Sequence, residues 1–120
     1  MEEYEVASNK LIDYIPYFES GSYDYYFNKS GFFTYDQDVN YFFLSVINEC
    51  YKYEVSWQDF VTEFDFYYQN QQELDHTDLE TLKKLLITIK SLERYRHGII
   101  ALCIDHGLLL AILNRIKMLS

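Results

Sequence analysis

The sequence predicts an all-α fold: a single compact domain of about five or six helices, with one irregular aromatic segment near residues 20–35. Three observations predict it. Apolar residues recur at the three- and four-residue spacing of a helix face in several separate stretches. Sequences typical of helix caps stand at the ends of these stretches, and the chain has one proline and four glycines. Its 120 residues, 49% of them hydrophobic, suit one domain with its own core.

The N-terminal region predicts one helix followed by the irregular segment. From Tyr4 to Phe18 the apolar residues recur at helical spacing. Pro16 should end or kink this helix, because proline lacks an N–H donor and its ring clashes one turn back. Between residues 20 and 35, Gly21 and the Asn-Lys-Ser-Gly sequence at 28–31 interrupt an aromatic stretch. This segment allows either a loop or a short hairpin.

Two aromatic helices are expected next. Residues 39–53 place these side chains on one face: Val39, Phe42, Phe43, Val46, Cys50 and Tyr53. Residues 57–68 do the same with Trp57, Phe60, Val61, Phe64, Tyr67 and Tyr68. Residues 56–59 (Ser-Trp-Gln-Asp) resemble a capping box with Asp in place of Glu, which predicts that the second helix begins there.

The last third of the chain predicts aliphatic helices. Residues 77–80 (Thr-Asp-Leu-Glu) form a full capping box, and the helix that follows has Leu79, Leu82, Leu86 and Ile89 on one face. A further helix is expected from near Arg94 to Gly107, since glycine suits the left-handed position after a helix end. Residues 108–119 are apolar almost all round, which predicts a helix in the centre of the domain.

Charge and aromatic content divide the chain into two chemical halves. Residues 1–80 carry seventeen Asp and Glu against three Lys, a balance of −14, whereas residues 81–120 carry seven Lys and Arg against two acids, a balance of +5. Every aromatic residue except Tyr95 lies at or before Tyr68. We expect an acidic aromatic layer (1–80) to pack on a basic aliphatic layer (81–120) within a single helical domain (1–120), helped by their opposite charges.

The overall charge excludes some classes of partner. A formal net charge of −9 and a pI near 4.6 argue against a nucleic-acid-binding protein or an anionic-membrane binder, because phosphate recognition depends on cationic contacts. The first residues lack the basic and apolar regions of a signal peptide. The apolar run from 99 to 113 is broken by Asp-His-Gly at 105–107, so no membrane anchor is expected. Cys50 and Cys103 are isolated thiols, which suits buried residues in a reducing cytoplasm.

No catalytic residue, metal site or cofactor is predicted. His76, His97 and His106 show no paired spacing with one another, and no phosphate-binding loop, GxGxxG or GxSxG sequence is present. His106 precedes Gly107, where a histidine complements a helix C-terminus. Surface and capping roles are therefore expected for the histidines, and an enzyme is the less favoured class.

Residues 93–97 (Glu-Arg-Tyr-Arg-His) form the densest polar cluster of the aliphatic third. Glu93 projects onto the apolar face of the helix before it, where an unpaired carboxylate would cost several kcal/mol. The favoured hypothesis is a structural ion-pair cluster of Glu93 with Arg94, Arg96 and Arg115. The alternative is an enzyme or a small-ligand-binding domain that uses Glu93, Arg94 and His97.

The acidic half contains the candidate partner-binding surface. On the 57–68 helix, Phe66 projects opposite the core face, between Asp59 and Thr62 and beside Glu63. Tyrosine is favoured at interfaces because it combines a large apolar ring with a hydrogen-bonding tip. The candidate residues for binding a partner protein are Tyr23, Asp24, Tyr25, Tyr26, Asp59, Glu63 and Phe66. The same exposure is expected for Tyr41, Leu44 and Tyr51 on the preceding helix, and a surface of half-exposed aromatics without a partner is the alternative.

Several short sequences follow one another in a recognisable order: Trp-Gln-Asp-Phe at 57–60, Leu85-Leu86, Glu93-Arg94-Tyr95 with Gly98, Gly107, and Ile-Leu-Asn-Arg-Ile at 112–116. This pattern, together with residues 11–18, resembles a family of short uncharacterised bacterial and phage proteins, domain-of-unknown-function family six-five-zero-eight. Ile87, Ser91 and Phe60 stand where the family pattern has Thr, Arg and Trp. The resemblance implies no activity, and no catalytic residue follows from it.

The leading functional hypothesis is a non-enzymatic, acidic protein-interaction module that docks on a basic surface of another protein. A phage or mobile-element inhibitor that presents a DNA-like negative face to a nucleic-acid-binding protein is the specific version of this hypothesis. The alternative is the enzyme or ligand-binding domain at Glu93. A symmetric homodimer is the third hypothesis, since its interface would cover the exposed aromatics.

Overall fold

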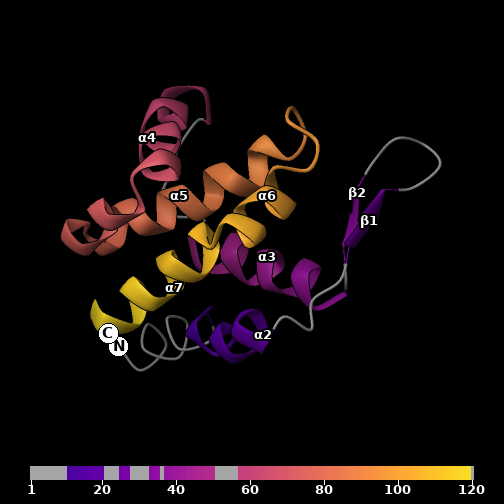
Figure 1. The fold of residues 1–120 in the computed structure, drawn as a ribbon, viewed down its shortest axis with the longest axis horizontal. Helices are drawn as coiled ribbons and strands as arrows, with labels where there is room; N and C mark the ends of the chain where they lie inside the picture. Colours follow the sequence, from indigo (N-terminus) through magenta and orange to yellow (C-terminus); the bar gives the residue numbers. More distant parts are fainter. Residues whose placement is uncertain (1–10, 21–24, 28–32, 36, 51–56, 120) are drawn as a thin grey trace.

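Helices make up most of the chain in a computed structural model, which describes residues 11–20, 25–27, 33–35, 37–50 and 57–119 (Figure 1). The elements, in order, are α2 (Ile15–Ser20), β1 (Tyr25–Phe27), β2 (Phe33–Tyr35), α3 (Gln37–Cys50), α4 (Trp57–Gln69), the 3-10 helix η1 (Gln71–His76), α5 (Leu79–Leu92), α6 (Ile99–His106) and α7 (Leu108–Leu119). The prediction of an all-α domain is confirmed, and the irregular segment contains the short hairpin that was one of its two alternatives.

The core is built around α5. This helix packs against α3, α4, α6 and α7, so it contacts both aromatic and aliphatic parts of the chain, with α4 above it in Figure 1. Five of its apolar side chains have no exposed surface: Leu82, Leu85, Leu86, Ile89 and Leu92. They belong to one cluster of buried residues that also contains aromatics of α2, α3 and α4. The single shared cluster makes the helices one domain, whereas the proposed division into two charged layers stays a prediction.

The aromatic residues of α2 and α3 pack as the periodicity predicts. Val39, Phe42, Phe43 and Val46 are buried on one face of α3. The rings of Tyr14 and Phe18 meet the ring of Phe42 edge to face, with centroids 5.2 and 5.3 Å away. Edge-to-face geometry brings the positive rim of one ring to the negative face of another. This cluster joins α2 to α3.

The predicted helix is interrupted near Pro16 as expected, but at residues 13–14, just before the proline. α2 starts at Ile15, after a turn in which the Tyr14 N–H donates to the Leu11 carbonyl at 3.2 Å. Pro16 therefore stands in the first turn of α2, where a helix makes no use of the N–H that proline lacks. The expected helix through Leu11 to Phe18 is thus divided just before the proline, and Tyr4 lies outside the described residues.

The hairpin is formed by β1 and β2, which run antiparallel. Tyr25 is paired with Tyr35, and Phe27 with Phe33. In Figure 1 the two strands lie at one end of the molecule, beside the start of α3. The Asn40 side-chain amide donates to the Tyr35 carbonyl at 3.4 Å, which ties the base of the hairpin to α3.

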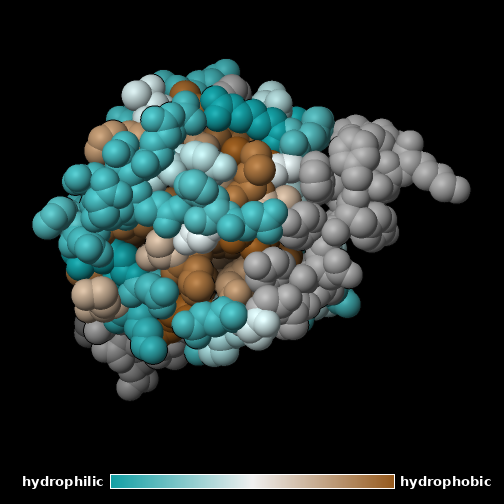
Figure 2. All heavy atoms as spheres, in the orientation of Figure 1, coloured by the Kyte–Doolittle hydropathy of each residue, from teal (hydrophilic) through white to brown (hydrophobic). Residues whose placement is uncertain are grey.

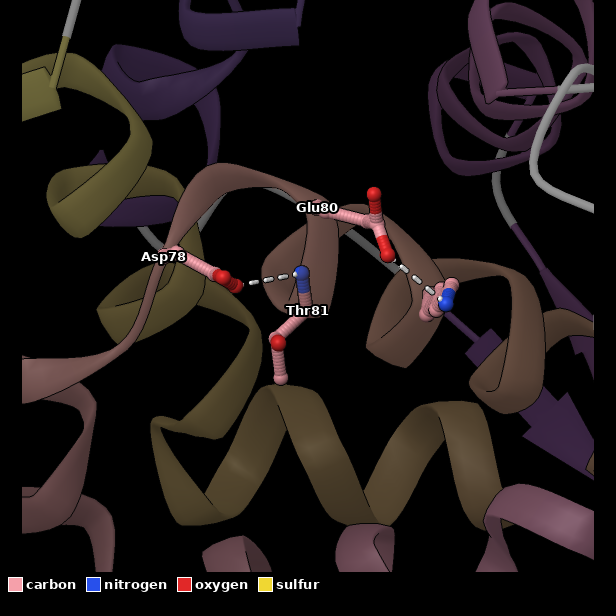
Figure 3. Close-up of polar contacts among 4 residues, drawn as sticks. Asp78, Glu80 and Thr81 are labelled. Atoms are coloured by element: carbon pink, nitrogen blue, oxygen red, sulfur yellow. Dashed lines mark hydrogen bonds and ion pairs between the residues drawn. The ribbon is translucent and has the colours of Figure 1, made fainter.

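The N-terminus of α5 is capped one residue later than the sequence predicts. Asp78, not Thr77, is the N-cap: its Oδ1 accepts the N–H of Thr81 at 2.9 Å (Figure 3). The Thr77 hydroxyl donates instead to the Glu73 carbonyl of η1. Glu80, the expected second partner of a capping box, pairs with Lys84 at 2.9 Å. Aspartate forms the stronger cap because a carboxylate also favours the positive end of the helix dipole.

Replacing Asp78 by alanine is expected to lower the free energy of unfolding by about 1 kcal/mol at pH 7, whereas asparagine retains most of the cap. Hydrogen bonding from the side chain and backbone of Thr81 lowers the pKa of Asp78 in the folded state. The stabilisation is therefore complete above the unfolded pKa of about 4 and is lost as the pH falls through the lower folded pKa. Urea unfolding of wild type and variant at pH 7 and pH 3 should give a smaller difference at pH 3. An equal difference in the free energy of unfolding at pH 7 and pH 3 would contradict the role of the Asp78 carboxylate as the cap of α5.

The helix after α5 begins later than predicted. Residues 93–98 form a turn, and α6 starts at Ile99 instead of near Arg94. Gly98 has φ 91°, a left-handed conformation that interrupts the helix and that glycine adopts without strain. The predicted end of α6 is confirmed: Gly107 has φ 84°, and its N–H donates to the Ile104 carbonyl.

α7 follows directly and is buried along most of its length, as its composition predicts. Its fully buried residues are Leu108, Leu109, Ile112, Leu113 and Ile116. Figure 2 shows hydrophobic residues in the middle of the viewed face, with hydrophilic residues over the neighbouring elements. Of the helices that the structure describes, none alone has the length and apolar composition of a membrane span. α6 and α7 reach that length and composition only as a pair, with a bend of 66° between them.

Candidate functional site

The turn between α5 and α6 is organised by the carboxylate of Glu93. Its Oε2 accepts the Gly98 N–H at 3.0 Å, and its Oε1 accepts the Ile100 N–H at 3.0 Å. Oε1 also accepts a hydrogen bond from the Tyr35 hydroxyl at 2.9 Å. A negative carboxylate at the N-terminus of α6 is favoured by the helix dipole and satisfies N–H groups that have no partner within the helix.

Tyr35 completes this cap from a position 58 residues earlier in the chain. While its hydroxyl donates to Glu93, its oxygen accepts the Ala101 N–H at 3.2 Å. Burial and the adjacent Glu93 carboxylate raise the pKa of Tyr35 well above its usual range, so the hydroxyl keeps the proton that it donates. The remaining N–H of this turn, that of Ile99, donates to the Arg96 carbonyl. All four N–H groups from Gly98 to Ala101 are therefore satisfied.

Among the described residues, the predicted ion-pair cluster of Glu93 with Arg94, Arg96 and Arg115 does not form. Arg96 pairs with Asp65 of α4 at 3.1 Å, and the Nε of Arg115 donates to the Thr77 carbonyl at 3.1 Å. Arg94 is exposed. Glu93 has hydrogen-bond partners instead of an ion pair: a tyrosine hydroxyl and backbone N–H groups. Sequence spacing could not indicate Tyr35, because the contact depends on where the hairpin folds back.

This arrangement suits a structural role for Glu93 better than a catalytic one. A general base needs a lone pair directed at a substrate proton, and the carboxylate of Glu93 already accepts three hydrogen bonds. Arg94 and His97 lie on the exposed side of the turn. The three residues of the enzymatic hypothesis are thus divided between a partly buried cap and an exposed turn.

Cys103 lies one turn into α6 and has no exposed surface. Burial, with a further contribution from the Glu93 carboxylate, raises the pKa of its thiol to about 12. A buried thiol with a raised pKa is a poor nucleophile, because the thiolate is the reactive form. The expectation that Cys103 is a small buried residue is confirmed, and Cys50 has no described side chain.

In a Cys50→Ser background, Cys103 is expected to react with an aromatic disulfide reagent only after unfolding. With a pKa of about 12, roughly one thiol in ten thousand is ionised at pH 8. Absorbance at pH 8 should show slow reaction without urea and rapid reaction in denaturing urea. Complete reaction of the folded protein within a minute would mean that the thiol is accessible and ionised.

His106 stacks on Tyr68 of α4. The ring centroids are 4.4 Å apart and the planes differ by 12°. The Nε2 of His106 is 2.9 Å from the Tyr68 carbonyl oxygen, and since a carbonyl can only accept, Nε2 carries the proton. The Gln71 side chain donates to the His106 carbonyl at 2.8 Å. The sequence predicted the position of His106 at a helix end but not this contact with α4.

Within the described ranges, no group of three or more His, Cys, Asp or Glu could hold a metal ion.

The outward face of α4 carries the remaining candidates. Asp59, Glu63 and Phe66 are all exposed, and Phe66 leaves 48% of its surface accessible. These three residues, here called the α4 face, are spaced by four and three positions, which places them on one side of the helix. The ring of Phe66 meets that of Tyr67 edge to face at 5.2 Å. The prediction that Phe66 points away from the core is confirmed.

The side chains of some of the other predicted surface residues are described, and those of others are not. Tyr41 and Leu44 are exposed on α3 as expected, and Ile47 joins them one turn further along. Tyr25 and Tyr26 belong to β1, of which the backbone alone is described. Tyr23, Asp24 and Tyr51 lie outside the described residues, so their predicted roles stay predictions.

Comparison with known proteins identifies the family without adding an activity. No curated protein and no solved structure matches the chain significantly. A family of unknown function, DUF6508, matches residues 6–120, which is nearly the whole sequence. This agrees with the resemblance seen in the short sequences between residues 57 and 116. The chain belongs to the family of unknown function DUF6508.

Proposed function

We propose that this protein is an interaction module whose α4 face docks on a basic surface of another protein. The observation that carries the proposal is that Asp59, Glu63 and Phe66 are exposed together on one side of α4. An exposed aromatic residue beside carboxylates offers both an apolar contact and charge-assisted hydrogen bonds.

The local charge supports a basic partner. Residues 57–76, which form α4 and η1, contain five Asp and Glu and no Lys or Arg. Asp65 is already paired with Arg96, so Asp59 and Glu63 are the α4 carboxylates left to meet charges on another molecule. Like charges gathered on one surface raise the rate of encounter with an oppositely charged protein.

Phe66 supplies the apolar contact. A large ring that becomes buried at the centre of an interface contributes more than the charges at its rim, which are screened by salt. With Glu63 and Asp59 on the two turns before Phe66, a matching partner surface would hold an apolar pocket with Lys or Arg beside it. Arginine suits such a position, since its planar group both stacks on an aromatic ring and pairs with a carboxylate.

A nucleic-acid-binding protein is the partner class that fits these requirements, because its binding surface is already basic. In the specific form of the proposal, the protein is an inhibitor, as a phage or mobile element would encode, and its carboxylates take the place of phosphates. The acidic balance of −14 over residues 1–80 supports this form.

Affinity capture from the native lysate tests the proposal, with elution in a salt gradient and identification by mass spectrometry. Wild type is compared with the double variant Phe66→Ala/Glu63→Lys and with a control of equal chemistry on α3, Leu44→Ala/Asp38→Lys. Leu44 is 53% exposed and Asp38 is exposed, so both variants lose one apolar side chain and reverse one charge. A basic protein retained by wild type and control, and lost with the α4 variant, is expected. Capture of the same proteins by all three would overturn the proposal.

A further inference from the structure

Tyr35 and Glu93 join two parts of the molecule that are far apart in the sequence. Tyr35 is the last residue of β2, and Glu93 ends α5. Their hydrogen bond of 2.9 Å connects the hairpin to the turn that carries the exposed residues Arg94 to His97. The Glu93 carboxylate also accepts the Gly98 and Ile100 N–H groups, and the Tyr35 hydroxyl also accepts the Ala101 N–H. Movement of either side chain therefore affects the first turn of α6.

We propose that Tyr35 and Glu93 form a latch, a two-way link by which the docking of the hairpin and the folded form of the α5–α6 turn stabilise each other. A partner that binds either part then changes the stability of the other. This inference is independent of the proposed function, because neither residue belongs to the α4 face.

The short length of α6 makes the turn depend on the latch. α6 has eight residues, and an isolated helix of that length is unstable in water. The N–H groups of Gly98, Ile100 and Ala101 receive their acceptors from the side chains of Glu93 and Tyr35, and of the first turn only the Ile99 N–H donates to the preceding backbone. Without these acceptors the groups would have to bond to water, which favours opening of the turn.

The hairpin depends on the latch in the same way. Two paired strands without further support are marginally stable in water. Tyr35 is the hairpin residue whose side chain is described: it is partly buried against the core, and its hydroxyl both donates to Glu93 and accepts from Ala101. Because a coupling free energy is reciprocal, unfolding of the turn must weaken the docking of the hairpin by the same free energy as undocking of the hairpin weakens the turn.

Hydrogen exchange read by mass spectrometry or NMR tests both directions of the latch on the full chain. Tyr35→Phe removes the hydroxyl and should accelerate exchange of the Gly98, Ile100 and Ala101 amides roughly ten- to hundredfold. Gly98→Ala strains the turn, because φ 91° suits glycine, and should accelerate exchange of the amides paired between β1 and β2. Tyr41→Phe is the matched control, since it removes an exposed tyrosine hydroxyl on α3.

Amides at the centre of α5 exchange by global unfolding, which also breaks the Tyr35 contact, so in Tyr35→Phe they should accelerate by no more than the loss of global stability measured by urea unfolding. Amides near the C-terminal end of α7, where opening leaves the Tyr35 contact intact, should keep the wild-type rate. The latch predicts acceleration at the turn with the first variant and at the hairpin with the second. The proposal is wrong if Tyr35→Phe leaves the exchange rates of the residue 98–101 amides unchanged, or if Gly98→Ala leaves those of the hairpin amides unchanged. Either result would mean that the link acts in one direction at most.

Discussion

Replacing Glu93 by alanine is expected to lower the free energy of unfolding by roughly 2–4 kcal/mol. The variant leaves the Gly98 and Ile100 N–H groups and the Tyr35 hydroxyl without their acceptor, and hydrogen bonds to a charged group contribute about 1.5–3 kcal/mol. Glu93→Gln should lose less, because the amide oxygen still accepts. Urea unfolding monitored by circular dichroism gives the difference.

Glu80→Ala is the matched control for this experiment. Glu80 lies on the same helix, but its partner is Lys84 in an exposed pair four residues away, and such a pair contributes about 0.5 kcal/mol or less. If the two alanine variants lost the same free energy, the cap of α6 would not be the stabilising feature that the geometry indicates.

Phe42→Ala is expected to lower the free energy of unfolding by about 3–5 kcal/mol, because it leaves a cavity where α2 and α3 pack together. The Phe42 ring is fully buried and meets the rings of Tyr14, Phe18 and Phe43. Its neighbour Tyr41 is 48% exposed, so Tyr41→Ala should change the free energy by less than about 1 kcal/mol. A similar loss for both variants in urea unfolding would mean that α3 does not bury the face described.

Helical periodicity predicted the faces of the helices correctly because it depends on local geometry alone. The buried side of α3 and the outward direction of Phe66 follow from which residues recur every three or four positions, and the burial of α7 follows from its being apolar almost all round. Gly107 was predicted for a similar reason, since a glycine after an apolar helix favours the left-handed conformation found there.

The errors concern helix starts, where alternative caps compete. Both Thr77 and Asp78 can cap α5, and Asp78 forms the cap because its negative charge is favoured at the positive end of the helix dipole. The start of α6 was predicted near Arg94, whereas residues 93–98 form a turn. The carboxylate of Glu93 instead accepts the N–H groups of Gly98 and Ile100, five and seven residues ahead, and also a long-range hydrogen bond from Tyr35, 58 residues earlier.

In the candidate site, too, features set by local helix geometry were predictable, whereas contacts between distant elements were not. The exposed acidic face of α4 was predictable, since Asp59, Glu63 and Phe66 share one helix. The cap at the α5–α6 turn and the stacking of His106 on Tyr68 were not, because both join residues at least 38 positions apart. Side-chain contacts between distant elements depend on tertiary packing, which a single sequence pattern does not encode.

The central claim, that the α4 face binds a basic partner, is tested most directly by the affinity of the captured protein, measured by calorimetry at low and moderate salt. The proposal predicts that Phe66→Ala/Glu63→Lys weakens binding at least about tenfold, while Leu44→Ala/Asp38→Lys stays within about twofold of wild type. It also predicts weaker wild-type binding at the higher salt, because exposed charges are screened. Equal affinities for wild type and the α4 variant, unchanged by salt, would contradict the claim.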